Sequence, residues 1–150
     1  MSTVTIIGAG MMGSALAFPL RENGNEVRLV GTPLDREIIN AAKADGTHIT
    51  LKRRLPDGIK YYQFEEYREA LEGADLLLSG VSSFGVDWFA ENVLRDLSAA
   101  LPVLSVTKGM MNTEDGSLIP YPELYRRLLA LCGGNDELIY LGAGDLYVTV

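Results

Sequence analysis

The sequence predicts an α/β fold in which a parallel sheet carries helices on both faces. Short apolar, often β-branched runs alternate along the chain with longer segments of helical periodicity. Runs such as residues 4–7 and 76–78 are apolar throughout, which is typical of strands buried on both faces. The expected strands are residues 4–7, 26–30, 59–62, 75–79 and 103–106.

The segments between these strands predict helices with recognisable ends. The expected helices are residues 11–23, 33–44, 64–71, 85–100 and 122–131. Gly24 and Gly73 follow two of them at the position where a glycine commonly stops a helix. Pro19 falls inside the first helix, and we expect it to bend that helix or end it early. Residues 45–57 are polar and basic and are expected to form a loop.

Composition limits the classes of function. The chain has 150 residues, 47% of them hydrophobic, and a net charge of −7, which argues against a nucleic-acid-binding surface. Cys132 is the only cysteine, so no intrachain disulfide can form, as is usual in a reducing compartment. The apolar residues 4–20 lack the basic start of a signal peptide, and no later stretch is long enough for a membrane span. We expect a cytoplasmic protein with no metal site.

A glycine pattern joins the first expected strand to the first expected helix. Gly8, Gly10 and Gly13 follow the order G-x-G-x-x-G, which suits a tight turn, close approach of a pyrophosphate and close packing of helix on strand. Amides at the start of the helix then face the anion. This context favours a Rossmann-type dinucleotide-binding domain over a plain glycine-rich turn. The predicted loop contacts to the cofactor are Gly8, Gly10, Met11, Met12 and Gly13.

The end of the second strand bears on the choice between NAD and NADP. An NAD site usually has an acidic residue there to bind the ribose 2′-hydroxyl, but this chain has Gly31 and Thr32. Asp35 lies too far along the chain for that role by sequence spacing. Thr32 and Arg36 could instead bind a 2′-phosphate. The cofactor is therefore expected to be NADP or NAD, with a slight preference for NADP.

Two further positions follow later strands, at the sheet edge where ligands bind in such folds. Ser82 comes after the strand at residues 75–79, and Lys108 comes after the strand at residues 103–106. A lysine there can reach the nicotinamide side of a cofactor or an anionic substrate. The alternative is that Lys108 is an ordinary solvated surface lysine. Its position after a strand at the ligand-binding edge favours a functional role.

These motifs together resemble NAD(P)-dependent glycerol-3-phosphate dehydrogenase. The matching stretches are "TIIGAGMMGSALAFPLRENGNEVRLVGT", "GADLLLSGVSS" and "LPVLSVTKGM", and they cover roughly residues 3–128. The resemblance implies hydride transfer between the cofactor and a small phosphorylated substrate, dihydroxyacetone phosphate or sn-glycerol 3-phosphate. His48 falls where the family often has a histidine, but a lone loop histidine is more often solvated and is not counted among the site residues.

The last segment, "LLALCGGNDELIYLGAGDLYVTV", resembles a family stretch ending in Gly-Asp-Leu-x-x-Thr. In the family this stretch belongs to a helical substrate domain, so the resemblance implies a cofactor domain at 1–127 and a remnant of the substrate domain at 128–150. It also implies catalytic positions at Asp145 and Thr149, which in the family lie beside the substrate and the catalytic lysine; Lys108 is the third candidate catalytic residue. The family's catalytic lysine, in a Leu-Lys-Asn context, has no counterpart, because no lysine follows Lys108. We therefore expect a truncated Rossmann-type domain that binds the cofactor but turns over weakly or not at all.

Two other functions stay open at this point. One is a non-catalytic dinucleotide-binding or assembly module, which the absent lysine favours. The other is a different Rossmann reductase, such as a ketopantoate reductase, against which the Thr-Lys-Gly and Gly-Asp-Leu-x-x-Thr stretches argue. A homodimer is also expected, because loss of the rest of a substrate domain would uncover apolar surface on the cofactor domain.

Overall fold

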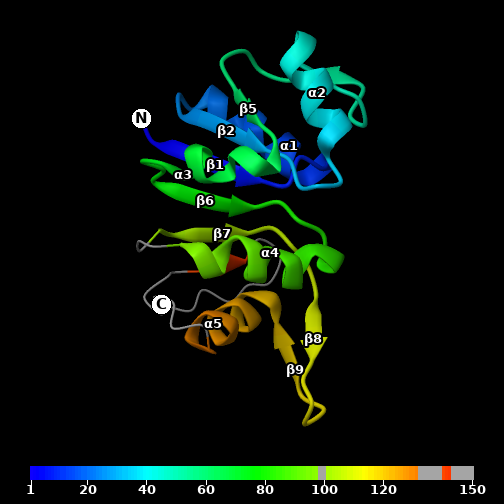
Figure 1. The fold of residues 1–150 in the computed structure, drawn as a ribbon, viewed down its shortest axis with the longest axis vertical. Helices are drawn as coiled ribbons and strands as arrows, with labels where there is room; N and C mark the ends of the chain where they lie inside the picture. Colours follow the sequence, from blue (N-terminus) through cyan, green and yellow to red (C-terminus); the bar gives the residue numbers. More distant parts are fainter. Residues whose placement is uncertain (98–100, 132–139, 143–150) are drawn as a thin grey trace. The chain divides into compact units, whose positions relative to one another are not determined.

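The computed structural model describes residues 1–97, 101–131 and 140–142, and side chains as far as residue 128 (Figure 1). The chain divides into two compact units, Met1–Gly80 and Val81–Val150. The predicted boundary between residues 127 and 128 concerns a different division, between a cofactor domain and a substrate domain, and it stays a prediction.

Unit 1 is built on four parallel strands, which lie in the order β6-β1-β2-β5. Ile7 of β1 is level with Val30 of β2 and with Ser79 of β6, so these three strands end at one edge of the sheet. The loops that follow them therefore meet at that edge. The strands are β1 (Thr3–Ile7), β2 (Glu26–Val30), β5 (Lys60–Tyr62) and β6 (Leu76–Ser79), as predicted to within a residue at each end.

Helices cover both faces of this sheet (Figure 1). Neighbouring residues of a strand point to opposite faces. Thr5 donates a hydrogen bond to the carbonyl of Ala70 in α3 (2.5 Å), whereas the side chain of Ile6 lies beneath Gly13 of α1. The two helices therefore lie on opposite faces, which confirms the predicted fold class. The unit's helices are α1 (Met11–Glu22), α2 (Arg36–Asp45), the 3₁₀ turn η1 (Phe64–Glu66) and α3 (Tyr67–Leu71).

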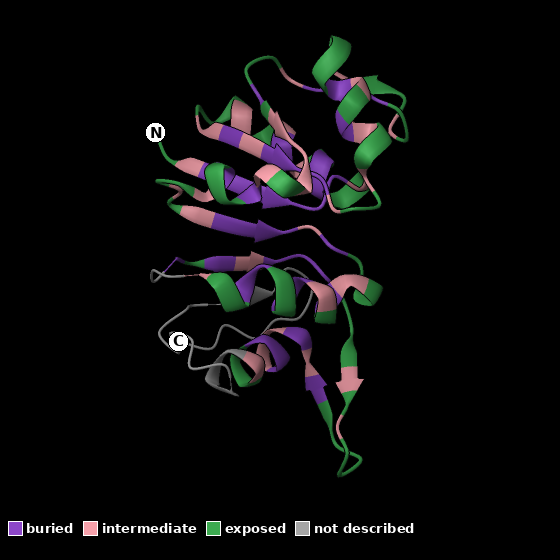
Figure 2. Ribbon diagram, viewed as in Figure 1, coloured by how far each residue is buried: buried purple, intermediate pink, exposed green. Residues whose placement is uncertain are grey.

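The central strands β1 and β6 are buried on both faces, as their largely apolar sequences predict, whereas β5 at the edge is partly exposed. In Figure 2, most of the length of β1 and β6 is coloured as buried. The side chains of Ile6, Ile7, Val27 and Leu29 are fully inaccessible to solvent. A core of this kind holds the strand ends, and the loops that leave them, in a defined position.

Two helix predictions need correction in unit 1. The helix α1 lies within a residue of its predicted range but does not end early at Pro19: it continues to Glu22, and the Pro19 carbonyl accepts a hydrogen bond from the backbone of Asn23 (3.0 Å). A bend at Pro19 stays a prediction. The helix α2 begins at Arg36 instead of residue 33. Its start is delayed because Thr32 and Asp35 form a separate turn, in which the Asp35 N–H donates to the Thr32 carbonyl at 2.9 Å.

The segment predicted as a loop, residues 45–57, contains a short antiparallel hairpin. Its strands are β3 (Thr47–His48) and β4 (Arg53–Arg54), with His48 opposite Arg53. The left-handed Gly46 (φ 81°) ends α2 and starts the hairpin. The guanidinium of Arg53 lies 4.3 Å from the ring centre of Phe18 in α1, so a cation–π contact helps to attach the hairpin to the unit.

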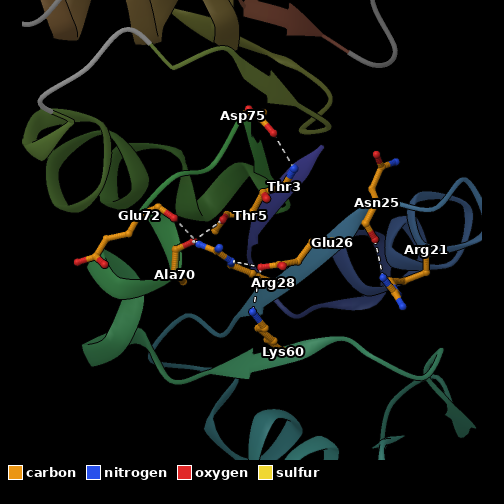
Figure 3. Close-up of polar contacts among 10 residues, drawn as sticks. All are labelled: Thr3, Thr5, Arg21, Asn25, Glu26, Arg28, Lys60, Ala70, Glu72 and Asp75. Atoms are coloured by element: carbon orange, nitrogen blue, oxygen red, sulfur yellow. Dashed lines mark hydrogen bonds and ion pairs between the residues drawn. The ribbon is translucent and has the colours of Figure 1, made fainter. Parts of the chain in front are cut away.

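A cluster of polar groups lies near the amino ends of the strands in unit 1 (Figure 3). Arg28 of β2 donates to Glu26 at 2.8 Å and to the carbonyls of Ala70 (3.0 Å) and Glu72 (2.6 Å) at the end of α3. Lys60 of β5 also contacts Glu26, at 3.1 Å. We call these five residues the amino-end cluster. Hydrogen bonds from Arg28 and Lys60 hold the pKa of Glu26 below its ordinary value.

Unit 2 contains two parallel strands, an antiparallel hairpin and helices. The elements are η2 (Ser83–Gly85), α4 (Val86–Asn92), η3 (Leu94–Asp96), β7 (Val103–Ser105), β8 (Met110–Asn112), β9 (Leu118–Pro120), α5 (Tyr121–Leu131) and β10 (Tyr140–Gly142). The strand β10 runs parallel to β7, and β8 and β9 form an antiparallel hairpin. The rings of Phe89 and Tyr125, both fully buried, pack α4 against α5 at 5.6 Å between centres.

Three features of unit 2 differ from the sequence predictions. The helix expected over 85–100 ends at Asn92, because Val93 (φ −121°, ψ −59°) leaves the helical conformation. The apolar face is nevertheless kept, since Val93 and Leu94 remain buried. The hairpin of β8 and β9 and the strand β10 were not predicted. The residues 98–100 of the expected helix lie outside the described residues.

Candidate functional site

The glycine loop begins where β1 ends. Gly8 has a φ of 110°, a conformation that L-residues with a side chain rarely adopt. Its N–H donates to the carbonyl of Val30 at 2.9 Å, so the loop is attached to the end of β2. The first glycine of the motif therefore makes the tight turn that the sequence predicted for it.

Two other glycines make room for the backbone of this loop. A Cβ atom at position 13 would lie 2.0 Å from the carbonyl oxygen of Gly8, so α1 can approach β1 only if position 13 is glycine. A Cβ atom at Gly80, after β6, would lie 2.9 Å from both the Gly8 oxygen and the Gly13 Cα. Gly80 was not predicted from the sequence, although its place directly after the apolar run "LLLS" is a usable signal.

The start of α1 is open. Gly10 precedes the helix in an extended conformation, no side chain caps the helix start, and a Cβ atom at Gly10 would have no neighbour within 4 Å. Met11 and Met12 are more than half exposed, at 59% and 54%. The first amides of a helix have no partner within the helix, and they attract anions. The predicted loop residues are thus brought together around free N–H groups.

The peptide groups on either side of Ala9 are held by distant residues. The Ala9 N–H donates to Oδ2 of Asp35 at 3.1 Å. The Ala9 carbonyl lies 2.8 Å from Nε2 of His48 and accepts a hydrogen bond from the Ser14 hydroxyl at 3.2 Å. We call Asp35, His48 and Ser14 the Ala9 clamp. Its members come from the start of α2, the β3–β4 hairpin and α1.

His48 is fully buried, contrary to the sequence expectation of a solvated loop histidine. Its Nδ1 accepts a hydrogen bond from the backbone N–H of Leu51 at 3.0 Å. The ring proton therefore lies on Nε2, which donates to the carbonyl of Ala9. No local pattern in the sequence marks this role, because the two bonded residues are far apart along the chain.

Asp35 also belongs to the loop region despite its distance along the sequence. Its Oδ2 atom accepts hydrogen bonds from the backbone N–H and the hydroxyl of Thr32, both at 2.8 Å, as well as from Ala9. The hydroxyl oxygen of Thr32 in turn accepts a weak hydrogen bond from the backbone N–H of Leu34 at 3.3 Å. The turn after β2 thus directs the carboxylate back toward the glycine loop.

Arg36 opens α2 directly after this turn. It forms an ion pair with Glu65, and the two side chains are 51% and 63% exposed. Exposed ion pairs contribute little to stability, so the guanidinium can exchange Glu65 for another anion at small cost. The structure therefore brings Thr32, Asp35 and Arg36 together in consecutive turns at the end of β2.

In unit 2, two loops carry the other predicted residues. The Thr107 hydroxyl donates to the Val81 carbonyl at 2.7 Å, which joins the segment after β7 to the segment that contains Ser82. Ser82 and Lys108 are both exposed. No described residue forms an ion pair with Lys108. Asp145 and Thr149 lie outside the described residues.

Within the described part of the chain, no group of histidine, cysteine, aspartate and glutamate side chains could hold a metal ion. The same part contains no helix of the length and apolar character that crossing a membrane requires.

A parallel sheet whose first strand leads through a glycine loop into a helix is the Rossmann type of α/β domain. The chain belongs to a family of this type, described as NAD-dependent glycerol-3-phosphate dehydrogenase N-terminus, whose family model matches residues 3–123. The family resemblance found in the sequence is thereby confirmed.

Comparisons with individual relatives indicate the same family. The chain is 40% identical, over 83% of its own length and 36% of the relative's, to the NADP(+)-dependent glycerol-3-phosphate dehydrogenase of Archaeoglobus fulgidus. It is 32% identical, over 73% and 32%, to the glycerol-3-phosphate dehydrogenase [NAD(P)+] of Shouchella clausii. The fold is similar to that of Plasmodium falciparum glycerol-3-phosphate dehydrogenase, with a TM-score of 0.74, 17% identity, and coverage of 94% and 40%. The chain spans about a third of the length of these curated relatives.

Proposed function

We propose that this chain is the cofactor-binding part of an NAD(P)-dependent glycerol-3-phosphate dehydrogenase. The observation that carries the proposal is the glycine loop, in which Gly13 and Gly80 allow close backbone packing and leave the start of α1 open. Family membership supports the reaction, which is hydride transfer between the cofactor and dihydroxyacetone phosphate or sn-glycerol 3-phosphate.

The cofactor's pyrophosphate would lie against the amides of Gly10, Met11, Met12 and Gly13. These amides donate hydrogen bonds to the phosphate oxygens without needing a positively charged side chain. The dipole of the twelve-residue α1 adds to the attraction for the anion. The absence of a Cβ atom at Gly10 lets the phosphates approach the backbone closely. This part of the proposal is independent of which dinucleotide binds.

The preferred cofactor is NADP. The exposed guanidinium of Arg36 can leave its ion pair with Glu65 and bind the 2′-phosphate of NADP instead. Guanidinium groups bind phosphates strongly. The Asp35 carboxylate accepts three hydrogen bonds through Oδ2, from Ala9 and Thr32, and these offset its negative charge. The relative from Archaeoglobus fulgidus named above is described as NADP(+)-dependent, which supports the same choice.

The cofactor preference is tested with the variant Arg36→Gln. We expect its NADPH affinity to fall about tenfold while its NADH affinity is unchanged, because only NADPH carries the 2′-phosphate. Lys43→Gln is the matched control, since Lys43 lies on the same helix and forms a similarly exposed pair with Glu66. Equal losses for both cofactors would argue against Arg36 as the 2′-phosphate ligand.

Ser82 and Lys108 are assigned to the reacting end of the cofactor, with Lys108 placing a positive charge near the substrate carbonyl or phosphate. Asp145 and Thr149 are assigned to the substrate by family resemblance alone. These 150 residues span about a third of the curated relatives' length and contain no lysine after Lys108, so by themselves they do not supply the family's proton donor. Loss of a positioned acid typically lowers the rate about 10²- to 10⁴-fold, so we expect this stretch assayed alone to bind the cofactor with weak or no turnover.

One experiment separates these parts of the proposal. NADPH and NADH are titrated against the protein by fluorescence, and reduction of dihydroxyacetone phosphate is then followed by loss of NADPH absorbance. Failure to bind either cofactor would overturn the proposed function, and rapid turnover would overturn the expected catalytic deficiency. A Lys108→Met variant with unchanged residual rate and affinity would favour the non-catalytic binding module instead.

We also propose a homodimer and a cytoplasmic location. The dimer is supported by exposed apolar side chains in unit 2, where Phe84, Met110 and Leu118 are 97%, 51% and 58% accessible. Light scattering of the purified protein tests the dimer, and a monomer at micromolar concentration would exclude it. The single cysteine supports the cytoplasmic location, which fractionation of the source cells tests.

A further inference from the structure

We propose that His48 is a positioning residue for the cofactor, because it aims the backbone N–H of Gly10 at the site of the pyrophosphate. The inference rests on the proposed dinucleotide binding at the glycine loop. It assigns a role to a buried side chain that does not itself touch the ligand.

The geometry of the peptide bond makes this connection. The Ala9 carbonyl and the Gly10 N–H belong to one planar trans peptide, so they point in opposite directions. His48 Nε2 holds the carbonyl at 2.8 Å. The Gly10 N–H is thereby directed away from His48. Since Cβ at Gly10 would meet no atom within 4 Å, that residue lies beside open space.

His48 is itself held firmly enough to act as a support. The ring is fully buried, and Leu51 N–H donates to Nδ1 at 3.0 Å. The same residue pairs with Arg53 in the β3–β4 hairpin. Because Nδ1 is an acceptor, the only ring donor is Nε2, and the hydrogen bond to Ala9 has a single possible direction.

The other two members of the Ala9 clamp limit the size of the effect. Asp35 holds the N–H of Ala9, which belongs to the preceding peptide, and so does not set the direction of the Gly10 amide. Ser14 donates to the same carbonyl as His48, but at the longer distance of 3.2 Å. Loss of His48 alone should therefore loosen the peptide without releasing it. One hydrogen bond of this kind corresponds to about a tenfold change in affinity at most.

Two substitutions separate the two nitrogen atoms of the ring. In His48→Gln, the side-chain amide can still donate to the Ala9 carbonyl. In His48→Asn, the shorter side chain can still accept from Leu51 but does not reach Ala9. We expect NADPH to bind His48→Asn about five- to tenfold more weakly than wild type, and His48→Gln within about twofold of wild type.

The outcomes distinguish this inference from the proposed function. If wild type binds neither NADPH nor NADH, the proposed function fails. If wild type binds and His48→Asn binds equally well, only the inference about His48 fails. Affinities are compared below the thermal transition of each variant. Equal weakening in both variants would show a general structural role and would also overturn the inference.

Wild-type protein provides a test that does not depend on the folding of a variant. His48 is the only histidine in the chain, so its ¹⁵N signals need no assignment. We expect the neutral ring to carry its proton on Nε2 and to keep it there when NADPH binds, while the Gly10 amide signal shifts. A proton on Nδ1, or a Gly10 amide that does not respond to NADPH, would overturn the proposal.

Discussion

The two ends of the parallel sheet in unit 1 are held by networks of different kinds. Near the amino ends, the amino-end cluster uses the charged side chains of Arg28, Lys60 and Glu26, and its donors bind carbonyls or carboxylates of the protein itself (Figure 3). At the carboxyl ends, the Ala9 clamp holds one short piece of backbone and leaves the first amides of α1 without a capping side chain. One network stabilises the fold, and the other leaves donors free for a ligand.

Substitutions at the two ends of the sheet should therefore have different effects on stability and on ligand affinity. Arg28 attaches the last turn of α3 to β2 through two backbone carbonyls, so its loss should lower stability and leave ligand affinity unchanged. At the opposite end, the contacts between Gly8, Gly13 and Gly80 are between backbones, so an added methyl group meets atoms that cannot rotate away. Substitutions there should affect both stability and binding.

The largest expected effect comes from Gly13→Ala. Its Cβ atom would lie 2.0 Å from the Gly8 oxygen, so α1 must move away from β1. We expect a loss of about 3 kcal/mol in the free energy of unfolding, and no measurable NADPH binding. Urea unfolding and NADPH titration check the two parts.

Gly10→Ala is the matched control, because nothing lies within 4 Å of its Cβ position. We expect nearly wild-type stability with NADPH binding weakened at least about tenfold, since the methyl group stands where the phosphates approach. If Gly13→Ala and Gly10→Ala lose stability equally, close packing of α1 on β1 is not the reason for glycine at position 13.

A smaller effect is expected from Arg28→Met at the amino end. The substitution keeps much of the side-chain volume but removes hydrogen bonds to Glu26, Ala70 and Glu72. We expect the free energy of unfolding to fall by about 2 kcal/mol, with an unchanged dissociation constant for NADPH. Lys60→Met, which removes only an exposed contact to Glu26, should cost less than about 1 kcal/mol. A clear loss of NADPH affinity in Arg28→Met would contradict the expectation that the amino-end cluster affects stability alone.

The smallest expected effect is the loss of the stabilisation by Glu26 at acidic pH. The pKa of Glu26 is lowered in the folded protein by hydrogen bonds from Arg28 and then Lys60. A lowered pKa means that Glu26 contributes stability above its ordinary pKa of 4.5, and that this contribution is lost as the pH falls through the lowered value. Wild type should therefore exceed Glu26→Gln in stability by less than about 1 kcal/mol near neutral pH. Urea titrations between pH 7 and about 3 should show that difference shrinking, and a constant difference would contradict the assignment.

The strands β1, β2, β5, β6 and β7 and the glycine loop could be located from the sequence because their signals are local. A strand buried on both faces needs only consecutive apolar residues, as in residues 76–78, and a phosphate-binding turn needs glycines at set spacings. The same reasoning misplaced the end of the helix that starts near residue 85 and the start of α2. In the second case, the side chain and backbone of Asp35 form a turn with Thr32 that periodicity does not reveal.

The fold class, the family and the place of the glycine loop were thus predictable from the amino-acid sequence alone. That Asp35, His48 and Gly80 all contact the glycine loop became visible only in the folded chain. His48 and Ala9 are 39 residues apart, and Asp35 and Ala9 are 26 apart, so neither pair produces a pattern in a local window. Backbone carbonyls and amides also look identical at every position of a sequence. Which of them is bonded, and which is left free for a ligand, is settled only when distant segments pack together.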